Sequence, residues 1–469
     1  MSLVKFFMNI IYQQIKVLLF MKIYQNSIIK GTFILMFAGI ITRFLGFYYR
    51  IFLSSRIGAE GMGLYQMIFP VYGLCLSLCA SGIQVSISRF VSGREKCSLK
   101  TLAAGLSIAL PLSLICSVII FFGSDIISST YLNEPRCSIL LKFSAISLPM
   151  AVIHSCVNGY FLGKKKAFVP GISQFIEQLA RVATAWCIFF MANEHLSDDI
   201  VSLAVVAVIG LVAGEFVSML VSIIATIIDN PISKRTLKGN YYCSVKRMVN
   251  PLAKMAFPLT MTNLILGLVH SLEATAIPFF LNKYGLTYGN AISIYGILTA
   301  MAMPFITFPT TVTGAVSRML LPTIAAAEAE RNYERISKLS LKTLKYSALL
   351  GMFCTCFFAL TGEKIGKIVY NNETAGDFIT ILAWLCPLMF ISGTVGSILH
   401  GLGLTKTTFY QNMAGSLLRL SFTIFAIPIY GIKGYLWGIL ASELLCTVLH
   451  TGSMLNYINK NKEISGARN

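Results

Sequence analysis

The chain has 469 residues, of which 56% are apolar and 12% are charged, and its formal net charge is +19. Soluble domains carry roughly 25% charged residues, so this composition indicates a membrane protein and excludes an ordinary soluble domain. The basic residues lie in the short links between apolar segments, as in the cytoplasmic loops of membrane proteins, which argues against nucleic-acid binding.

The sequence lacks the motifs of the common catalytic sites. No Walker A, GxSxG or HExxH pattern occurs, so we predict no ATP hydrolysis and expect a protein that is not an enzyme. The twelve cysteines are scattered and form no CxxC pair, and the five histidines form no cluster in the sequence. We therefore predict buried thiols rather than disulfides, and neither a metal site nor a cofactor.

Residues 1–28 form an N-terminal extension. Its apolar run is interrupted by Lys16 and lacks a small-residue cleavage site, so we predict an interfacial segment rather than a signal peptide. Twelve apolar segments follow, each near or above the ~20 residues that cross a bilayer as a helix. They cover about residues 31–54, 62–91, 101–123, 138–162, 168–192, 200–228, 254–281, 289–319, 340–361, 376–402, 407–430 and 432–456.

The links between these segments predict the topology. With the N-terminus in the cytoplasm, 25 Lys and Arg residues fall in cytoplasmic segments and 6 in outer links. This bias predicts a multi-pass protein of the cytoplasmic membrane with both termini inside the cell. The charged stretch at 325–345 predicts a separate amphipathic helix on the cytoplasmic surface.

The two halves of the chain repeat a pattern of Pro, Gly and Arg with spacings of 14 and 18 residues. The matched residues are Pro149, Gly163 and Arg181 in the first half and Pro387, Gly401 and Arg419 in the second. Each half has an even number of segments, so the halves enter the membrane in the same orientation. The predicted fold is therefore all-α, with about 12 transmembrane helices in two six-helix lobes.

We place the N-lobe at residues 29–228 and the C-lobe at 254–457. Residues 229–253 form a polar cytoplasmic link between the lobes, and 458–469 form a cytoplasmic tail. In transporters built from such repeats, the substrate site lies between the lobes near mid-membrane. The architecture thus favours a transporter over a receptor or an anchor.

Arginines within the membrane are the candidate substrate-binding residues. Arg43 and Arg50 are seven residues apart, so they share one face of the first helix, and neither has an acidic residue nearby in sequence. A charge at membrane depth costs about 2.5–3.5 kcal/mol on insertion scales and normally faces protein or a wet cavity. The planar fork of Arg suits phosphate oxygens, so this excess of cations predicts an anionic ligand.

Two further groups of ionisable residues lie in other segments. Glu177 and Arg181 have the i,i+4 spacing of an ion pair, which holds a helix in place as readily as it binds a ligand. His270 and Glu273 share a face of the seventh helix. They are candidates for ion coupling or gating, and a bond across the lobe interface explains them equally well.

The opening run KGTFILMFAGIITRFLGFYYRIFLSSRIGAEGMGLYQMIFPVYGLCLSLCASGIQVSISRFVS resembles the stage V sporulation protein B family, in the polysaccharide-exporter branch of the MOP flippase superfamily. Further similar stretches are VPGISQFIEQLARV (169–182), YGILTAMAMPFITFPTTVTGAVSRMLLPTIAAA (295–327) and ILHGLGLTKTTFYQNMAG (398–415). The motif TRFLGF also resembles the lipid II flippases of the superfamily.

This resemblance implies a V-shaped carrier that moves undecaprenyl-diphosphate-linked sugars, such as a lipid II-like precursor of peptidoglycan or spore cortex, by alternating access. Its partners would be that lipid, bilayer lipids and enzymes of cell-wall synthesis. We expect Arg43 and Arg50, with Arg181 and Arg419, to bind the diphosphate, and Glu273, His270 and Glu177 to serve ion coupling or gating.

Two other functions remain open from the sequence. A cation-coupled multidrug antiporter of the MATE type would share the fold, but its cationic substrates favour acidic lobes rather than a surplus of Arg. The other alternative is a scaffold that recruits cell-wall enzymes and transports nothing.

Overall fold

The computed structural model describes residues 27–93, 97–191, 199–229 and 244–466, with side chains from residue 39 to residue 461. The predicted extension at 1–28 therefore lies almost wholly outside the described residues. Residues 230–243, the middle of the predicted link, also lie outside the described residues.

The described chain is helical, with no strand. Its first half contains α2 (Ser27–Met67), α3 (Phe69–Leu76), the π-helical segment η1 (Ser77–Ser81), α4 (Gly82–Gly93), α5 (Ser98–Ile126), the π-helical segment η3 (Ile127–Tyr131), α6 (Cys137–Gly163), α7 (Phe168–Met191) and α8 (Ile200–Asp229).

The second half contains α9 (Val245–Lys283), α10 (Tyr288–Gly296), the π-helical segment η4 (Ile297–Ala302), α11 (Met303–Thr307), α12 (Thr310–Ala329), α13 (Tyr333–Tyr370), α14 (Glu373–Leu382), α15 (Leu385–Gly401), α16 (Thr405–Phe425), α17 (Ile427–Tyr430) and α18 (Ile432–Gly466). The end of the predicted link is therefore helical and continuous with α9.

Each of the twelve predicted segments coincides with a helix or a run of adjoining helices. By length and composition, 8 helices of the described chain could cross a membrane, or 9 when the bent pair α14–α15 counts as one span. One of these covers Gly39–Gly93, and its 55 residues are long enough to cross twice, since a helix rises ~1.5 Å per residue. Neither α7 nor α16 is among the 8, because both carry charged and amide side chains.

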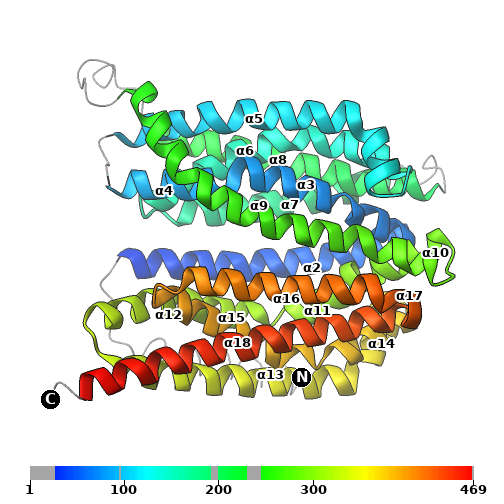
Figure 1. The fold of residues 1–469 in the computed structure, drawn as a ribbon. Helices are drawn as coiled ribbons and strands as arrows, with labels where there is room; N and C mark the ends of the chain where they lie inside the picture. Colours follow the sequence, from blue (N-terminus) through cyan, green and yellow to red (C-terminus); the bar gives the residue numbers. More distant parts are fainter. Residues whose placement is uncertain (1–26, 94–96, 192–198, 230–243, 467–469) are drawn as a thin grey trace.

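The helices form two groups, as Figure 1 shows: α3 to α9 above, and α2 with α10 to α18 below. The long helices α2 and α9 connect them. Helix α2 packs against α7 and α8 of the first half and against α10 and η4 of the second. Helix α9 packs against α3, α4 and α5 and also against α10 and α16.

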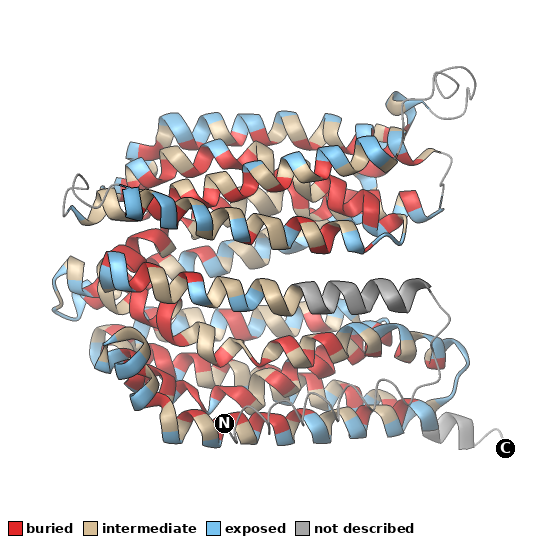
Figure 2. Ribbon diagram, turned by 180° about the vertical axis from the view of Figure 1, so that it is seen from behind, coloured by how far each residue is buried: buried red, intermediate tan, exposed pale blue. Residues whose placement is uncertain are grey.

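Apolar side chains fill the spaces between the helices, and others face outward. Buried residues lie mainly where helices meet (Figure 2). Large apolar side chains such as Phe122, Phe190 and Leu360 are highly exposed on the outer surfaces. Such surfaces suit contact with lipid, while the helices satisfy their own backbone hydrogen bonds.

Two sequence predictions are wrong. The stretch 325–345 is not a separate surface helix: α12 ends at Ala329, and α13 runs unbroken from Tyr333 to Tyr370. The polar start of α13 therefore continues directly into a helix long and apolar enough to cross the membrane. Cys97 is disulfide-bonded, contrary to the expectation for the cysteines, whereas the ten other described cysteines are free.

Candidate functional site

Arg43 joins the first span to the second half of the chain. Its Nη1 donates hydrogen bonds to Oγ1 of Thr310 at 3.2 Å and of Thr311 at 3.0 Å, both on α12. These hydroxyls donate to carbonyls of their own segment, so their lone pairs face the guanidinium. Arg43 is exposed and has no carboxylate within 4.0 Å among the described side chains. Its positive charge is thus uncompensated.

Aromatic side chains support the same contact between α2 and the second half. The Phe44 ring meets Phe308 edge to face at 4.9 Å between centroids, and the Phe47 ring meets Phe305 at 4.5 Å. Phe305 lies in α11 and Phe308 in the turn before α12. These contacts hold the Arg43 turn of α2 against the start of α12.

Arg318, which is not among the site residues predicted from the sequence, belongs to this region. It lies on α12, two turns beyond Thr311, and interacts electrostatically with Arg43. Its Nε donates to the Gly314 carbonyl at 3.3 Å, and it has no carboxylate partner within the described chain. Two exposed, uncompensated arginines within electrostatic range repel each other, so an anion bound near both would relieve the repulsion.

Arg50 lies two turns beyond Arg43 on α2 and is more buried. Its Nη1 donates to the Thr299 carbonyl at 3.4 Å, and Nε2 of Gln66 donates to the same oxygen at 3.4 Å. Thr299 lies inside η4, and π-helical segments are frequent at functional sites. Arg50 has no carboxylate partner among the described residues, but it interacts electrostatically with Tyr65 and Arg181.

Arg181 is buried in the first half and its charge is compensated. Its Nη2 lies 2.7 Å from Oε1 of Glu177 and 3.8 Å from Oε1 of Glu215 on α8. Helix α8 comes close because Gly210 and Gly214 face α7: a Cβ on Gly214 would lie 3.4 Å from Arg181 Nε. The GLVAG spacing at 210–214 is the small-residue pattern of closely packed membrane helices, and it is a sequence signal for this contact.

Arg419, the matched residue in the second half, is also paired. Its Nε lies 2.5 Å from Oε1 of Glu273, and its Nη2 lies 2.9 Å from Nδ1 of His270. Tyr435 on α18 donates to Oε1 of Glu273 at 2.6 Å. His270, Glu273 and Arg419 thus form one network between α9 and α16. The structure brings these predicted residues together, and it places them apart from Arg43.

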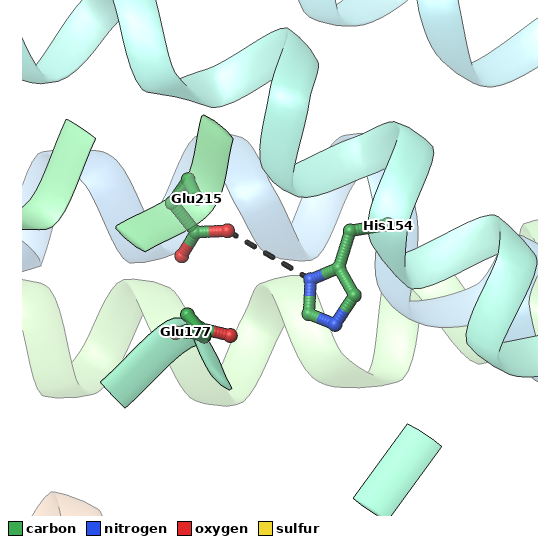
Figure 3. Close-up of side chains that lie close together, drawn as sticks. All are labelled: His154, Glu177 and Glu215. Atoms are coloured by element: carbon green, nitrogen blue, oxygen red, sulfur yellow. Dashed lines mark ion pairs between the residues drawn. The ribbon is translucent and has the colours of Figure 1, made fainter. Parts of the chain in front are cut away.

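A third cluster, which the sequence did not reveal, lies around Arg181. His154 on α6 places Nδ1 3.8 Å from Oε2 of Glu215, which points toward the imidazole, and Glu177 lies beside them (Figure 3). Ligand atoms of these three residues lie within 4.8 Å of one another, close enough to hold a cation. Because the guanidinium of Arg181 already supplies one positive charge, we interpret the cluster as an ionic network and not as a metal centre.

One end of the molecule, where α2 meets α10, is tightly packed. An added Cβ on Gly63 would lie 2.2 Å from the Ile292 carbonyl oxygen, and one on Gly296 would lie 2.3 Å from the Ala59 carbonyl oxygen. The backbones of the two helices therefore touch. By contrast, Arg43, Phe44 and other residues in the earlier part of α2 are exposed.

An ion cluster lies at the same end. Arg136, in the turn before α6, places Nη1 2.7 Å from Glu60 on α2 and Nε 2.8 Å from Glu134. The hydrogen bonds that Arg136 donates to Glu134 are the main cause that raises the pKa of Arg136 above its ordinary value, and its bond to Glu60 adds to this rise. These bonds tie the end of α2 to the turn between η3 and α6.

Comparison with family models gives two matches. The model described as polysaccharide biosynthesis protein matches residues 28–328, and the MatE model matches residues 284–425. Among curated proteins, stage V sporulation protein B of Bacillus subtilis is 27% identical over 92% of this chain and 84% of its own length. The lipid II flippase MurJ of the same organism is 24% identical over 89% of this chain and 80% of its own length.

Solved structures show the same fold at low sequence identity. An inward-facing multidrug resistance MATE family transporter of the MOP superfamily has a TM-score of 0.70 at 16% identity, and the match covers 90% of this chain and 96% of that one. A MOP superfamily transporter from Pyrococcus furiosus, described as having a binding pocket of reverse polarity, has a TM-score of 0.64 at 17% identity, and the match covers 93% of this chain and 96% of that one. The fold is therefore that of a multi-pass MOP-type membrane protein with two helical lobes.

Proposed function

The chain belongs to the polysaccharide biosynthesis protein family, and from this premise we propose that it is a flippase for undecaprenyl-diphosphate-linked sugars. The observation that carries the proposal is the pair Arg43 and Arg318, which are exposed, interact electrostatically and have no carboxylate partner in the described chain. Its relatives named stage V sporulation protein B and lipid II flippase support a precursor of peptidoglycan or spore cortex as cargo. The protein would then act as a carrier and not as an enzyme.

The diphosphate would bind first at Arg43 and Arg50, with Arg318 as a further contact. Arg43 uses only Nη1 in its bonds to the two threonines, so its other N–H groups remain to grip a phosphate oxygen pair. Arg181 and Arg419 are held by glutamates and would reach the diphosphate only after these pairs rearrange. The prenyl tail would stay among bilayer lipids, outside the helices.

Alternating access would move the headgroup between the two faces of the membrane. The contact of α2 with α10 closes one end, and the exposed arginines lie toward the other. With both termini in the cytoplasm, as the charge bias predicts, this conformation opens inward. Moving one elementary charge through 100 mV yields about 2.3 kcal/mol, enough to bias transport without ATP.

The MATE-type antiporter remains the second candidate, because the MatE model matches residues 284–425. In that case buried acids such as Glu273 would bind a cation in exchange for a cationic drug. In the structure, the carboxylate of Glu273 is already paired with Arg419, and this ion pair disfavours binding of a cationic substrate to Glu273.

Transport by the purified protein tests both candidates. The full chain would be placed in vesicles with a fluorescent undecaprenyl-diphosphate-linked sugar, and outward exposure of the sugar would be followed with a membrane-impermeant quencher. Sugar translocation that requires Arg43 supports the flippase. Uptake of cationic dye that requires Glu273, without sugar translocation, supports the antiporter.

A further inference from the structure

An apolar groove lies between α9 and α16, where the two helices converge toward α10 (Figure 1). Its volume is about 280 Å³. Leu272 on α9 is 47% exposed and Ile424 on α16 is 37% exposed, so the groove is open along its edge. An apolar cavity holds hydrocarbon in preference to water. The apolar side chains of its wall are Leu272, Ala276, Phe279, Phe280, Leu420 and Ile424.

The groove lies at the depth of the outer leaflet. Helix α9 begins at Val245, next to the predicted cytoplasmic link, and ends at Lys283. With the topology that the charge bias predicts, this helix runs from the cytoplasmic to the outer face. The groove covers residues 272–280, which rise ~12 Å along the helix axis. This length fits within one leaflet, which is about half of the ~30 Å hydrocarbon layer.

Hydrogen-bond donors lie at the inner end of the groove. His270 and Arg419 directly precede this stretch on their helices, and Nη2 of Arg419 lies 2.9 Å from Nδ1 of His270. Because a guanidinium can only donate, Nδ1 accepts, and the neutral imidazole carries its proton on Nε2. The side chain of His270 is 53% exposed, so this N–H group can reach a ligand. An anionic headgroup bound here would place its hydrocarbon chain beside the groove.

The first half of the chain completes the groove. Asn133, between η3 and α6, forms part of the wall, and the Tyr131 hydroxyl oxygen lies 2.7 Å from Oγ of Ser271 on α9. At the outer end, Nζ of Lys283 lies 4.8 Å from the centre of the Phe279 ring. The wall therefore combines residues of both halves, and its shape depends on how the halves meet.

We propose that this groove binds the prenyl chain of the lipid-linked sugar, with the diphosphate near His270 and Arg419. A prenyl lipid has one chain and fits a groove bordered by one pair of helices, whereas a phospholipid has two chains. The chain then lies on the outer surface of the helices and remains in contact with the bilayer. The inference rests on the proposed function, because it names where the chain of the same cargo lies.

Photo-crosslinking of the full chain in lipid nanodiscs tests the site. The probes are undecaprenyl-diphosphate-linked sugar and undecaprenol, each with a diazirine on the prenyl chain, and the labelled peptides are identified by mass spectrometry. We expect label within residues 272–280 of α9 and 420–424 of α16. Excess unlabelled undecaprenyl diphosphate should remove this label, and the same excess of phosphatidylglycerol should not.

Filling the groove tests its contribution to affinity. Ile424→Trp should raise the Kd for the undecaprenyl lipid roughly 10-fold or more, because the chain loses its apolar contacts. It should leave unchanged the Kd for an analogue with a single isoprene unit, which does not reach the groove. The matched control is Ile119→Trp on α5, at a position that is 59% exposed, and it should leave both Kd values as in wild type. Should Ile424→Trp fail to fold, Ala276→Phe fills the same groove.

Three results would overturn the inference: label spread evenly over the outer helices, displacement of the label by phosphatidylglycerol, or an equal rise in Kd for Ile424→Trp and Ile119→Trp. The displacement result would assign the groove to phospholipid. If wild type binds the sugar lipid but the label lies elsewhere, the groove fails and the proposed function stands. If undecaprenol labels the groove but no diphosphate lipid binds the protein, the proposed function fails and the site for a prenyl chain stands.

Discussion

Arg43 Nη1 lies 3.0 Å from Thr311 Oγ1, and this hydrogen bond joins the first span of the chain to α12 of the second half. The arginine therefore lies between the halves, where a carrier of this fold would hold its cargo. Because the bond partner is a neutral hydroxyl, the positive charge of Arg43 remains available to an anion.

Arg318→Ala should weaken binding of the lipid diphosphate, because Arg318 interacts electrostatically with Arg43 and neither has a carboxylate partner among the described residues. A hydrogen bond to a charged group contributes about 1.5–3 kcal/mol, so we expect roughly a 10- to 100-fold rise in Kd. Fluorescence titration with the labelled lipid would measure it. In the double variant with Arg43→Ala, the two losses should not add, because both residues grip one anion.

Arg335→Ala is the matched control for Arg318, since Arg335 is also an arginine of the second half but pairs with Glu330. It should leave the Kd unchanged. Equal weakening by both substitutions would mean that general surface charge, and not the site at Arg43, attracts the lipid.

Glu273→Ala should destabilise the protein, because it leaves the guanidinium of Arg419 and the Tyr435 hydroxyl without their partner. Removing one member of a buried ion pair costs about 3 kcal/mol or more. We expect a drop of several degrees in the Tm measured in detergent. The double substitution Glu273→Leu with Arg419→Met should recover part of this loss. A Tm as high as that of the control Glu363→Ala, at an exposed position, would contradict the structural role.

Gly63→Ala should open the end of the molecule at which α2 meets α10. The added Cβ would lie 2.2 Å from the Ile292 carbonyl oxygen, so the two helices must separate. Spin labels at Asn133 and Glu373, in a background without the exposed Cys187 and Cys356, would measure the distance between the halves. We expect a longer distance in the variant.

The matched control for Gly63 is Gly73→Ala, because an added Cβ at Gly73 meets no atom within 4 Å. It should leave the distance distribution as in wild type. A distribution in Gly63→Ala identical to that of Gly73→Ala would show that the contact with α10 does not close this end.

Hydrophobicity and charge predicted most of the fold, because the bilayer sets the length of each span and the positive-inside rule sets the charge of the loops that flank it. Local spacing also predicted the Glu177–Arg181 ion pair, which depends only on one helical turn. The prediction of a separate helix at 325–345 was wrong. The sequence shows where the chain changes from polar to apolar, but it does not show that one unbroken helix runs through this change.

Contacts between helices distant in the sequence could not be predicted in this way. Glu215 is 34 residues from Arg181, and His154 is on another helix again, so no local pattern links them. The pairing of Arg419 with Glu273 across α16 and α9 likewise follows from packing alone. The sequence thus separated Arg181, with its local acid, from Arg43 and Arg50, but only the structure shows that Arg419 is paired as well.

The central claim is that an uncompensated arginine between the halves holds the diphosphate of a lipid-linked sugar. Native mass spectrometry of the purified protein with undecaprenyl-diphosphate-linked precursor tests it most directly, comparing wild type with Arg43→Ala and with the control Arg56→Ala on the same helix. We predict that wild type and Arg56→Ala bind the lipid, and that Arg43→Ala loses binding while its Tm is preserved. Equal lipid binding by all three proteins, or no binding by wild type, would contradict the account.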